Sequence, residues 1–177
     1  DVQHQQSALS GENIRLNAKK NISIAGGILS AKKDVELNAK GDVSLTAVKD
    51  LYSEESEVGK RGSSYYNHNK QVDEAVKGST IAAKNDISIA SGKDINIKGS
   101  NVASEAGKAD LTAENNINIA NETEYHERLH EEHNKVSGVL SSKTTDIYDY
   151  SKQNTVVGSN VSAGELAISS KKDTNIT

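Results

Sequence analysis

The sequence predicts an all-β fold, a right-handed parallel β-helix, on three observations. Short segments that alternate apolar and polar residues recur along the 177 residues. Most come in pairs about eight residues apart, which is too close for the hairpins of an ordinary sheet. A third short segment precedes most pairs, so one coil is expected to hold three strands and three corners in about 21–22 residues.

The clearest pair lies between Asn85 and Ile97. There, Asp86–Ile89 reads DISI and Asp94–Ile97 reads DINI. Alternation with a period of two is typical of a short strand with one buried face. The Asp that opens each strand suits a tight corner, because its short side chain can bond to nearby backbone groups.

The paired unit recurs along the whole chain, and the segment before it usually opens with Gly-Ser, as at Gly78 and Gly99. These repeats predict a single β-helix segment of five coils, interrupted by two longer excursions. The expected coils span about 8–24, 27–46, 79–97, 100–119 and 157–176, and the excursions span about 48–77 and 121–155.

Stacking of coils supplies the expected core. A single coil cannot bury its own inward side chains, but coils stacked about 4.8 Å apart pair every strand with the strands above and below. The preference of parallel crossovers makes the coil right-handed. We expect inward aliphatic side chains to lie over one another, with Ile87, Ile89, Ile95 and Ile97 over Ala109, Leu111, Ile117 and Ile119.

The two excursions differ from the coils in composition, since they contain all six Tyr and four of the five His. In the second, a Gly-Ser turn near Ser137-Gly138 predicts a strand, a turn and a returning strand. A short helix over 122–135 is the alternative, because Tyr125 and Leu129 are four residues apart. The first excursion contains more Gly and Ser, and we expect it to be less regular.

The second excursion and the coils around it resemble a known family. Ser137-Gly138 and Lys143-Thr144-Thr145 are followed by Thr155–Val161, which reads TVVGSNV, and then by paired strands of the D-x-I-x-I type. This order resembles the haemagglutinin repeats of filamentous haemagglutinin and of contact-dependent growth inhibition exoproteins, which use two-partner secretion. The segment from Gly92 to Ser100 fits the same repeat.

The resemblance implies a structural and adhesive module of a large secreted bacterial surface protein. It implies an outer-membrane secretion partner, passage through the periplasm before export, and contact with bacterial or host cell surfaces, including the outer membrane of a target cell. In the growth-inhibition members it also implies delivery of a C-terminal toxin to neighbouring bacteria. A passive spacer without a binding role is the alternative.

Composition argues against several other classes of function. The formal charge of −4 gives no basic field to attract nucleic acid, and no apolar run is long enough for a membrane-spanning helix. Without Cys there are no disulfides or thiolate chemistry. A chain that begins Asp-Val-Gln and contains no Met is expected to be part of a longer protein.

One segment matches an enzyme motif, the H-E-x-x-H of His126-Glu127-Arg128-Leu129-His130. On a helix this spacing places two His on one face for Zn²⁺, and His133 could be a third ligand. On a strand, His126 and His130 would be about 13 Å apart, too far for one metal ion. We therefore favour a solvated polar segment, with no catalytic residue and no metal, cofactor or small-molecule substrate.

Cleavage of carbohydrate, known for some parallel β-helices, is a further alternative. It needs carboxylates that converge on one groove, whereas most Asp residues here fall at corners. The best candidates for recognition are aromatic, because Tyr is enriched where proteins meet partners. The alternative is that they pack the excursions onto the coils, and this is the favoured interpretation. The candidates are Tyr52, Tyr65, Tyr66, Tyr125, Tyr148 and Tyr150.

Overall fold

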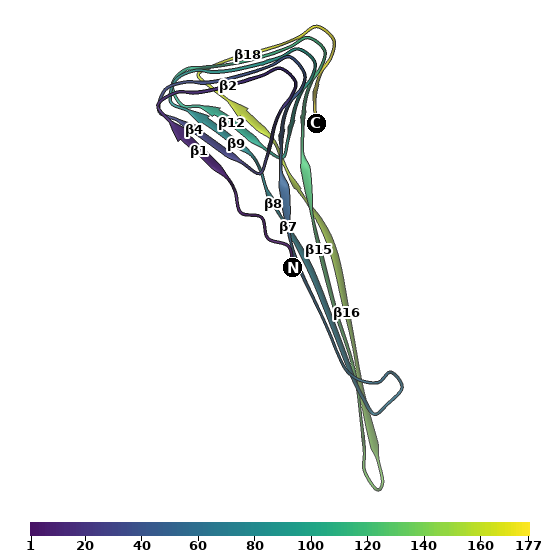
Figure 1. Cartoon of the computed structure of the whole chain (residues 1–177). Helices are drawn as coiled ribbons and strands as arrows, with labels where there is room; N and C mark the ends of the chain where they lie inside the picture. Colours follow the sequence, from purple (N-terminus) through teal and green to yellow (C-terminus); the bar gives the residue numbers. More distant parts are fainter. The chain divides into compact units, whose positions relative to one another are not determined.

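The computed structural model describes residues 1–177 and confirms the parallel β-helix with excursions. It divides into two compact units (Figure 1). The β-helix unit comprises His4–Lys49, Val76–Glu122 and Val156–Thr177. The hairpin unit comprises Asp1–Gln3, Asp50–Ala75 and Thr123–Thr155. No helix is long and apolar enough to cross a membrane.

Three parallel five-stranded sheets form the β-helix unit, and each coil contributes one strand to each sheet. The first sheet contains β1 (Ala8–Gly11), β4 (Ile28–Ala31), β9 (Thr80–Ala83), β12 (Asn101–Ser104) and β17 (Asn160–Ser162). The second contains β2 (Ile14–Ala18), β5 (Val35–Ala39), β10 (Ile87–Ser91), β13 (Lys108–Ala113) and β18 (Glu165–Ser170). The third contains β3 (Ile22–Ala25), β6 (Val43–Thr46), β11 (Ile95–Lys98), β14 (Ile117–Ala120) and β19 (Thr174–Ile176).

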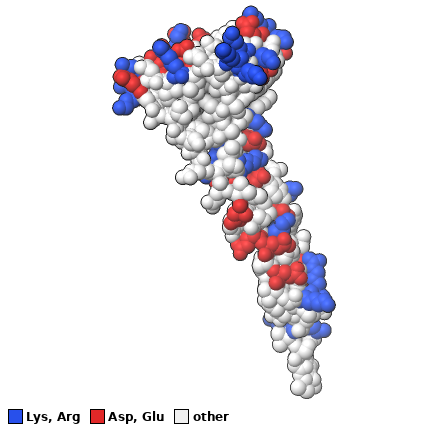
Figure 2. Space-filling model, in the orientation of Figure 1, with Lys and Arg blue, Asp and Glu red and all other residues white.

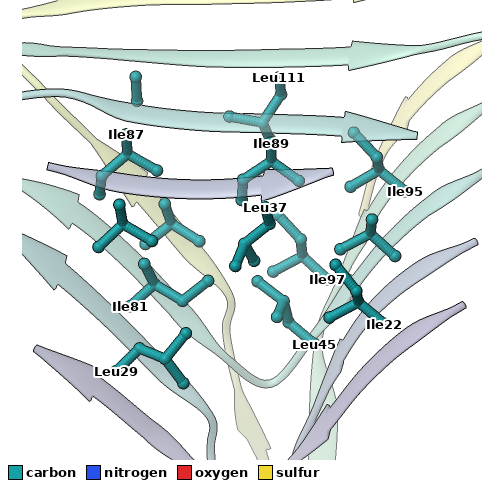
Figure 3. Packing of buried hydrophobic residues seen from close by; sticks show 14 of the residues in the cluster. Ile22, Leu29, Leu37, Leu45, Ile81, Ile87, Ile89, Ile95, Ile97 and Leu111 are labelled. Atoms are coloured by element: carbon teal, nitrogen blue, oxygen red, sulfur yellow. The ribbon is translucent and has the colours of Figure 1, made fainter. Parts of the chain in front are cut away.

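Coils stack in register, so aliphatic side chains lie over aliphatic side chains. Ile87 pairs with Val35 on one side and Ala109 on the other, and Ile95 pairs with Val43 and Ile117. Figure 3 shows the resulting core, in which Ile87, Ile95 and the other labelled side chains point to a common interior. The predicted stacking is confirmed, and the inward aliphatic residues of the middle coils are fully buried.

Asp and Asn side chains at the corners between the second and third sheets form a ladder of hydrogen bonds, which we call the corner ladder. The carboxylate of Asp42 accepts a hydrogen bond from the backbone N–H of Asp94 (3.2 Å), and the carboxylate of Asp94 accepts one from Asn116 (2.9 Å). The side-chain oxygens of Asn21 and Asn116 continue the ladder to the neighbouring coils. Each corner side chain therefore satisfies a backbone donor of the next coil, which explains why these positions are Asp or Asn.

Serine side chains fix the corner where the chain returns from a hairpin to the coil. Ser79 Oγ contacts the carbonyl oxygens of Ile24 and Thr46 at 2.9 and 2.7 Å. Ser159 Oγ makes the equivalent contacts one repeat later, at 3.4 Å from Ile97 and 2.5 Å from Ala120. The preceding Gly78 has no room for a side chain, because a Cβ there would collide with the carbonyl of Gly99. The Gly-Ser pairs of the sequence thus have a structural role.

Two hairpins make up the antiparallel sheet of the hairpin unit. The first joins β7 (Val48–Gly59) to β8 (Tyr65–Lys77), and the second joins β15 (Glu122–Ser137) to β16 (Ser142–Val157). The strand order is β16-β15-β8-β7, so β8 and β15 connect the two hairpins. The predicted strand, turn and returning strand of the second excursion is confirmed.

One alternative and one expectation about the excursions were wrong. The helix over 122–135 does not form, because β15 instead pairs its backbone with β8 from His126 opposite Asp73 to Asn134 opposite Tyr65. The first excursion is not irregular, since its strands have 12 and 13 residues. Its glycines are confined to the end of β7 and the turn that follows, where Gly59 and Gly62 adopt positive φ angles of 85° and 86°.

The corner ladder gives a first prediction. Asp94→Ala removes an acceptor for the backbone N–H of Asn116, so the free energy of unfolding should fall by about 1 kcal/mol. Asp94→Asn keeps the oxygen and should stay close to wild type. Urea unfolding followed by far-UV circular dichroism measures both. Equal losses in the two variants would show that charge, rather than the acceptor, matters at this corner.

Candidate functional site

The Tyr side chains all lie in the hairpin unit, and four of them share one face of its sheet. The β8–β15 register places Tyr66 opposite His133, so by alternation Tyr125 lies on the same face. His133 hydrogen bonds Asp146, and the Lys152 ammonium lies 5.1 Å from the Tyr125 ring centre, which puts the even-numbered residues of β16 on this face as well. The Tyr face therefore contains Tyr66, Tyr125, Tyr148 and Tyr150.

These tyrosines are not equally available to a partner. Tyr66 is 3% exposed, with the Arg61 guanidinium 5.4 Å from its ring centre and Arg61 Nε donating to its hydroxyl. Tyr125 is half-buried and donates to Glu127 at 2.8 Å. Tyr148 and Tyr150, with Tyr52 and Tyr65, are exposed. The structure thus divides the six candidates between packing and open surface.

The H-E-x-x-H segment lies on β15, and its side chains point to both faces of the sheet. His126 and His130 share a face, where they contact Asp73 (3.0 Å) and Asn69 (2.6 Å). Glu127 and His133 lie on the opposite face, and no three His, Asp or Glu side chains form a group that could hold a metal ion. The helical arrangement on which this zinc motif depends is therefore not formed.

A network of charged groups crosses the Tyr face. Arg61 pairs with Glu131 at 2.7 Å, and Lys70 pairs with Glu127 at 3.1 Å. His68, which is largely buried, lies 2.8 Å from Glu55 and 3.7 Å from Glu131. Hydrogen bonds from Tyr125 and Lys70 lower the pKa of Glu127, and the Glu127 carboxylate in turn raises the pKa of Tyr125. These groups neutralise one another and join the strands of the sheet.

On the β-helix unit, the outward face of the second sheet offers little for carbohydrate cleavage. Glu36 is paired with Arg15 at 3.2 Å, and Asp110 accepts a hydrogen bond from Thr112. Ser88 lies between Glu36 and Asp110 in the sheet, and this unit has no aromatic side chain on which a sugar could stack. The carboxylates there do not converge on a groove.

The most exposed apolar residues lie at the end of the second hairpin, and the sequence did not single them out. Leu140 is 99% exposed, Val139 is fully exposed and Val136 is 64% exposed. Val139 and Leu140 lie inside a turn that is closed by a hydrogen bond from Gly138 N–H to the Ser141 carbonyl (2.7 Å), and Val136 lies just before it. We call residues 136–141 the hairpin tip; the end of this unit is free of charged side chains in Figure 2.

The hairpin tip extends past its neighbour and is flanked by basic residues. Pairing of β15 with β8 ends where Asn134 lies opposite Tyr65 and Lys135 N–H bonds the Ser64 carbonyl. Lys135 and Lys143 flank the tip, and no acidic residue lies between Glu132 and Asp146 in the sequence. The signal available in the sequence was an aliphatic Val-Leu pair inside a Gly-Ser turn, where a polar turn is usual.

The carboxylate of Asp73 makes the stability of the hairpin unit depend on pH. Hydrogen bonds from Gln71 and then His126 lower its pKa from the ordinary 3.8. The folded state thus favours the charged form, so this stabilisation is complete above about pH 4 and is lost as pH falls through the lowered pKa. Asp73→Asn should remove that part of the acid sensitivity, worth up to about 1 kcal/mol.

Near-UV circular dichroism can measure this effect in the hairpin unit alone, because the protein has no Trp or Phe and all six Tyr lie there. Thermal midpoints of wild type and Asp73→Asn should differ at neutral pH and converge as the pH falls through the lowered pKa of Asp73. Two curves that stay parallel over the whole range would exclude Asp73 as the source.

Comparison with known proteins gives matches in sequence. The chain matches the family described as "Hemagglutinin repeat" over residues 1–61 and 58–177. It is 26% identical over 178 residues to a protein of Burkholderia pseudomallei (strain 1026b) called tRNA nuclease CdiA-2. The match covers 96% of this chain but only 6% of that relative. No solved structure matches.

Proposed function

Because the chain belongs to the hemagglutinin repeat family, we propose that its β-helix unit is a stiff scaffold and its hairpin unit a contact surface for other cells. Family membership and the much longer relative support a repeat module within a large secreted exoprotein. We further propose that this exoprotein leaves the cell through an outer-membrane secretion partner. The module itself is proposed to have no enzymatic activity.

A purely structural role for the β-helix unit follows from how its side chains are used. The inward positions are aliphatic and fully buried in the middle coils. The corner carboxylates accept backbone hydrogen bonds from the next coil, as Asp42 and Asp94 do. Such a unit can lengthen coil by coil without a change in its core, which suits a filament.

The exposed apolar hairpin tip is the observation that most strongly supports cell contact. Aliphatic side chains that project beyond the rest of a sheet can enter the boundary between lipid headgroups and acyl chains. Burying Val136, Val139 and Leu140 there would contribute about 1.5–3 kcal/mol each at most. Lys135 and Lys143, next to the tip, suit the phosphates of anionic lipids. We propose the lipid surface of a bacterial cell as the partner of the tip.

Toxin delivery is a proposal that rests on the relative. That protein is called a tRNA nuclease, and a module like this one spans a small part of its length. The present chain has a formal charge of −4 and no basic face for RNA, so we assign any nuclease activity to another part of such a protein. The hairpins would then bring the exoprotein to the target membrane.

Replacing the apolar residues of the tip tests cell contact against the spacer alternative. Val139→Ser with Leu140→Ser should weaken binding to vesicles of phosphatidylglycerol and phosphatidylethanolamine by tenfold or more, because about 1.4 kcal/mol corresponds to tenfold. Flotation of the full chain with the vesicles measures this. Val156→Ser, an exposed aliphatic position outside the tip, is the matched control and should bind like wild type. If the wild type does not float with the vesicles, the proposed contact is contradicted and the spacer alternative is supported.

The flanking lysines should provide the preference for anionic lipid. Lys135→Gln and Lys143→Gln should each reduce binding about fivefold, since a Lys near such a surface contributes about 1 kcal/mol. The loss should vanish in 0.5 M salt and on vesicles of neutral phosphatidylcholine. Lys19→Gln, on the β-helix unit, serves as the control. An equal loss on neutral vesicles would contradict an electrostatic role.

A further inference from the structure

The outer edge of β16 is the most open backbone of the hairpin unit. β16 is the last strand of the sheet, and its residues 142–154 are all exposed. At 16 residues it is longer than most strands. A long strand edge with unpaired N–H and C=O groups is a template for another strand.

The chain already pairs a hairpin with the segment before it in two places, once through an isolated bridge and once through a strand, and the two pairings are equivalent. Val2 and Leu51 exchange two backbone hydrogen bonds of 2.8 Å in an antiparallel bridge. The β8–β15 register, with His126 opposite Asp73, sets Tyr125 opposite Glu74. Val2 lies six residues before Ala8, and Glu74 lies six residues before Thr80. Ala8 and Thr80 are equivalent positions in the first sheet, because both align with Ile28.

Leu51 and Tyr125 are equivalent in the same way. Each lies eight residues after a stacked position of the third sheet, Val43 and Ile117, and both of these align with Ile95. The returning strand of one repeat is thus placed against the outgoing strand of the next at a constant register.

Counting six residues back from the first sheet identifies the equivalent position on β16. Asn154 lies six residues before Asn160, which stacks with Asn101 and, through it, with Thr80. Asn154 is therefore the β16 counterpart of Val2 and Glu74. We propose that the free edge of β16 binds the hairpin of the following repeat of the same polypeptide, with Asn154 opposite the counterpart of Tyr125. Successive hairpins then form one continuous antiparallel sheet.

Strand spacing makes such a sheet compatible with the coil. Each repeat adds two coils, hence two strands to each parallel sheet, and one hairpin, hence two strands to the antiparallel sheet. Neighbouring strands are about 4.7–4.9 Å apart in both kinds of sheet. Both units therefore lengthen by about 9.6 Å per repeat, which explains why one hairpin follows every two coils.

Charge also suits a second copy of the β15–β16 hairpin on this edge. The proposed register puts Lys152 opposite the incoming counterpart of Glu127, and Asp149 opposite that of His130. The existing β8–β15 pairing already places a carboxylate opposite a His side chain, as in Asp73 with His126. The proposal does not depend on what the hairpin tip contacts.

A chain extended by its own repeat tests the proposal. Thr177 N–H bonds the Ile119 carbonyl, so Thr177 continues the register in which Lys98 pairs with Ala120. Thr177 is therefore the counterpart of Lys98. A second copy of residues 99–177 can thus follow Thr177 directly. The protein contains no Cys. Gln153→Cys, with His126→Cys in the added copy, should form a disulfide, because directly opposed Cα atoms of antiparallel strands are about 4.5–5.5 Å apart.

The control is Gln153→Cys with His130→Cys in the added copy, on the same strand and face but about 13 Å farther along. Oxidation should close the first pair at least tenfold faster than the second, measured by mobility on non-reducing gels. Equal rates, or a disulfide between two separate chains, would overturn the proposal. Hydrogen exchange on the Cys-free extended chain gives a second test: the outward N–H groups of β16 should become protected, and unchanged exchange would also overturn it.

Discussion

Register between stacked coils is the constraint on which the rest of this structure depends. Each strand hydrogen bonds to the strands above and below, so a shift by one residue would turn every aliphatic side chain outward. Ile87 stays over Val35 although a whole hairpin separates them in sequence. The corner ladder and the buried Ser79 impose the same requirement, since each polar side chain must meet a backbone group of a neighbouring coil. Excursions are tolerated only if the chain returns in register.

This requirement also shapes the hairpins. An excursion must leave and re-enter the coil at neighbouring corners, which an antiparallel hairpin does because its ends are adjacent. The second hairpin then pairs with the edge of the first. Side-chain contacts across the two strands, such as Lys70 with Glu127 and Asp73 with His126, stabilise this pairing. The His and Glu side chains that made this segment resemble a metal site in sequence thus contact residues of the neighbouring strand β8.

The sequence was informative where structure is local and periodic. Alternation at Asp86–Ile89 and its repeats specify a strand, its buried face and the coil period, so the β-helix and its stacking could be predicted. The helix alternative at Tyr125 and Leu129 could not be dismissed, because pairing with β8 joins residues more than 50 positions apart. For the same reason the sequence could not divide the tyrosines: burial of Tyr66 depends on Arg61 and on strands that only the fold brings together.

The hairpin tip differs from the rest of the protein in how its apolar side chains are covered. Apolar residues in the coil are satisfied by stacking, and those in the sheet, such as Tyr66, are covered by neighbouring strands. Val139 and Leu140 have neither option, because the second hairpin continues past Tyr65, the first residue of β8, and no strand of the sheet covers it there. Shortening the hairpin would remove this exposure without disturbing the register of any coil. Stability therefore does not explain these residues, and this is why we propose that they contact an apolar partner at the end of the hairpin.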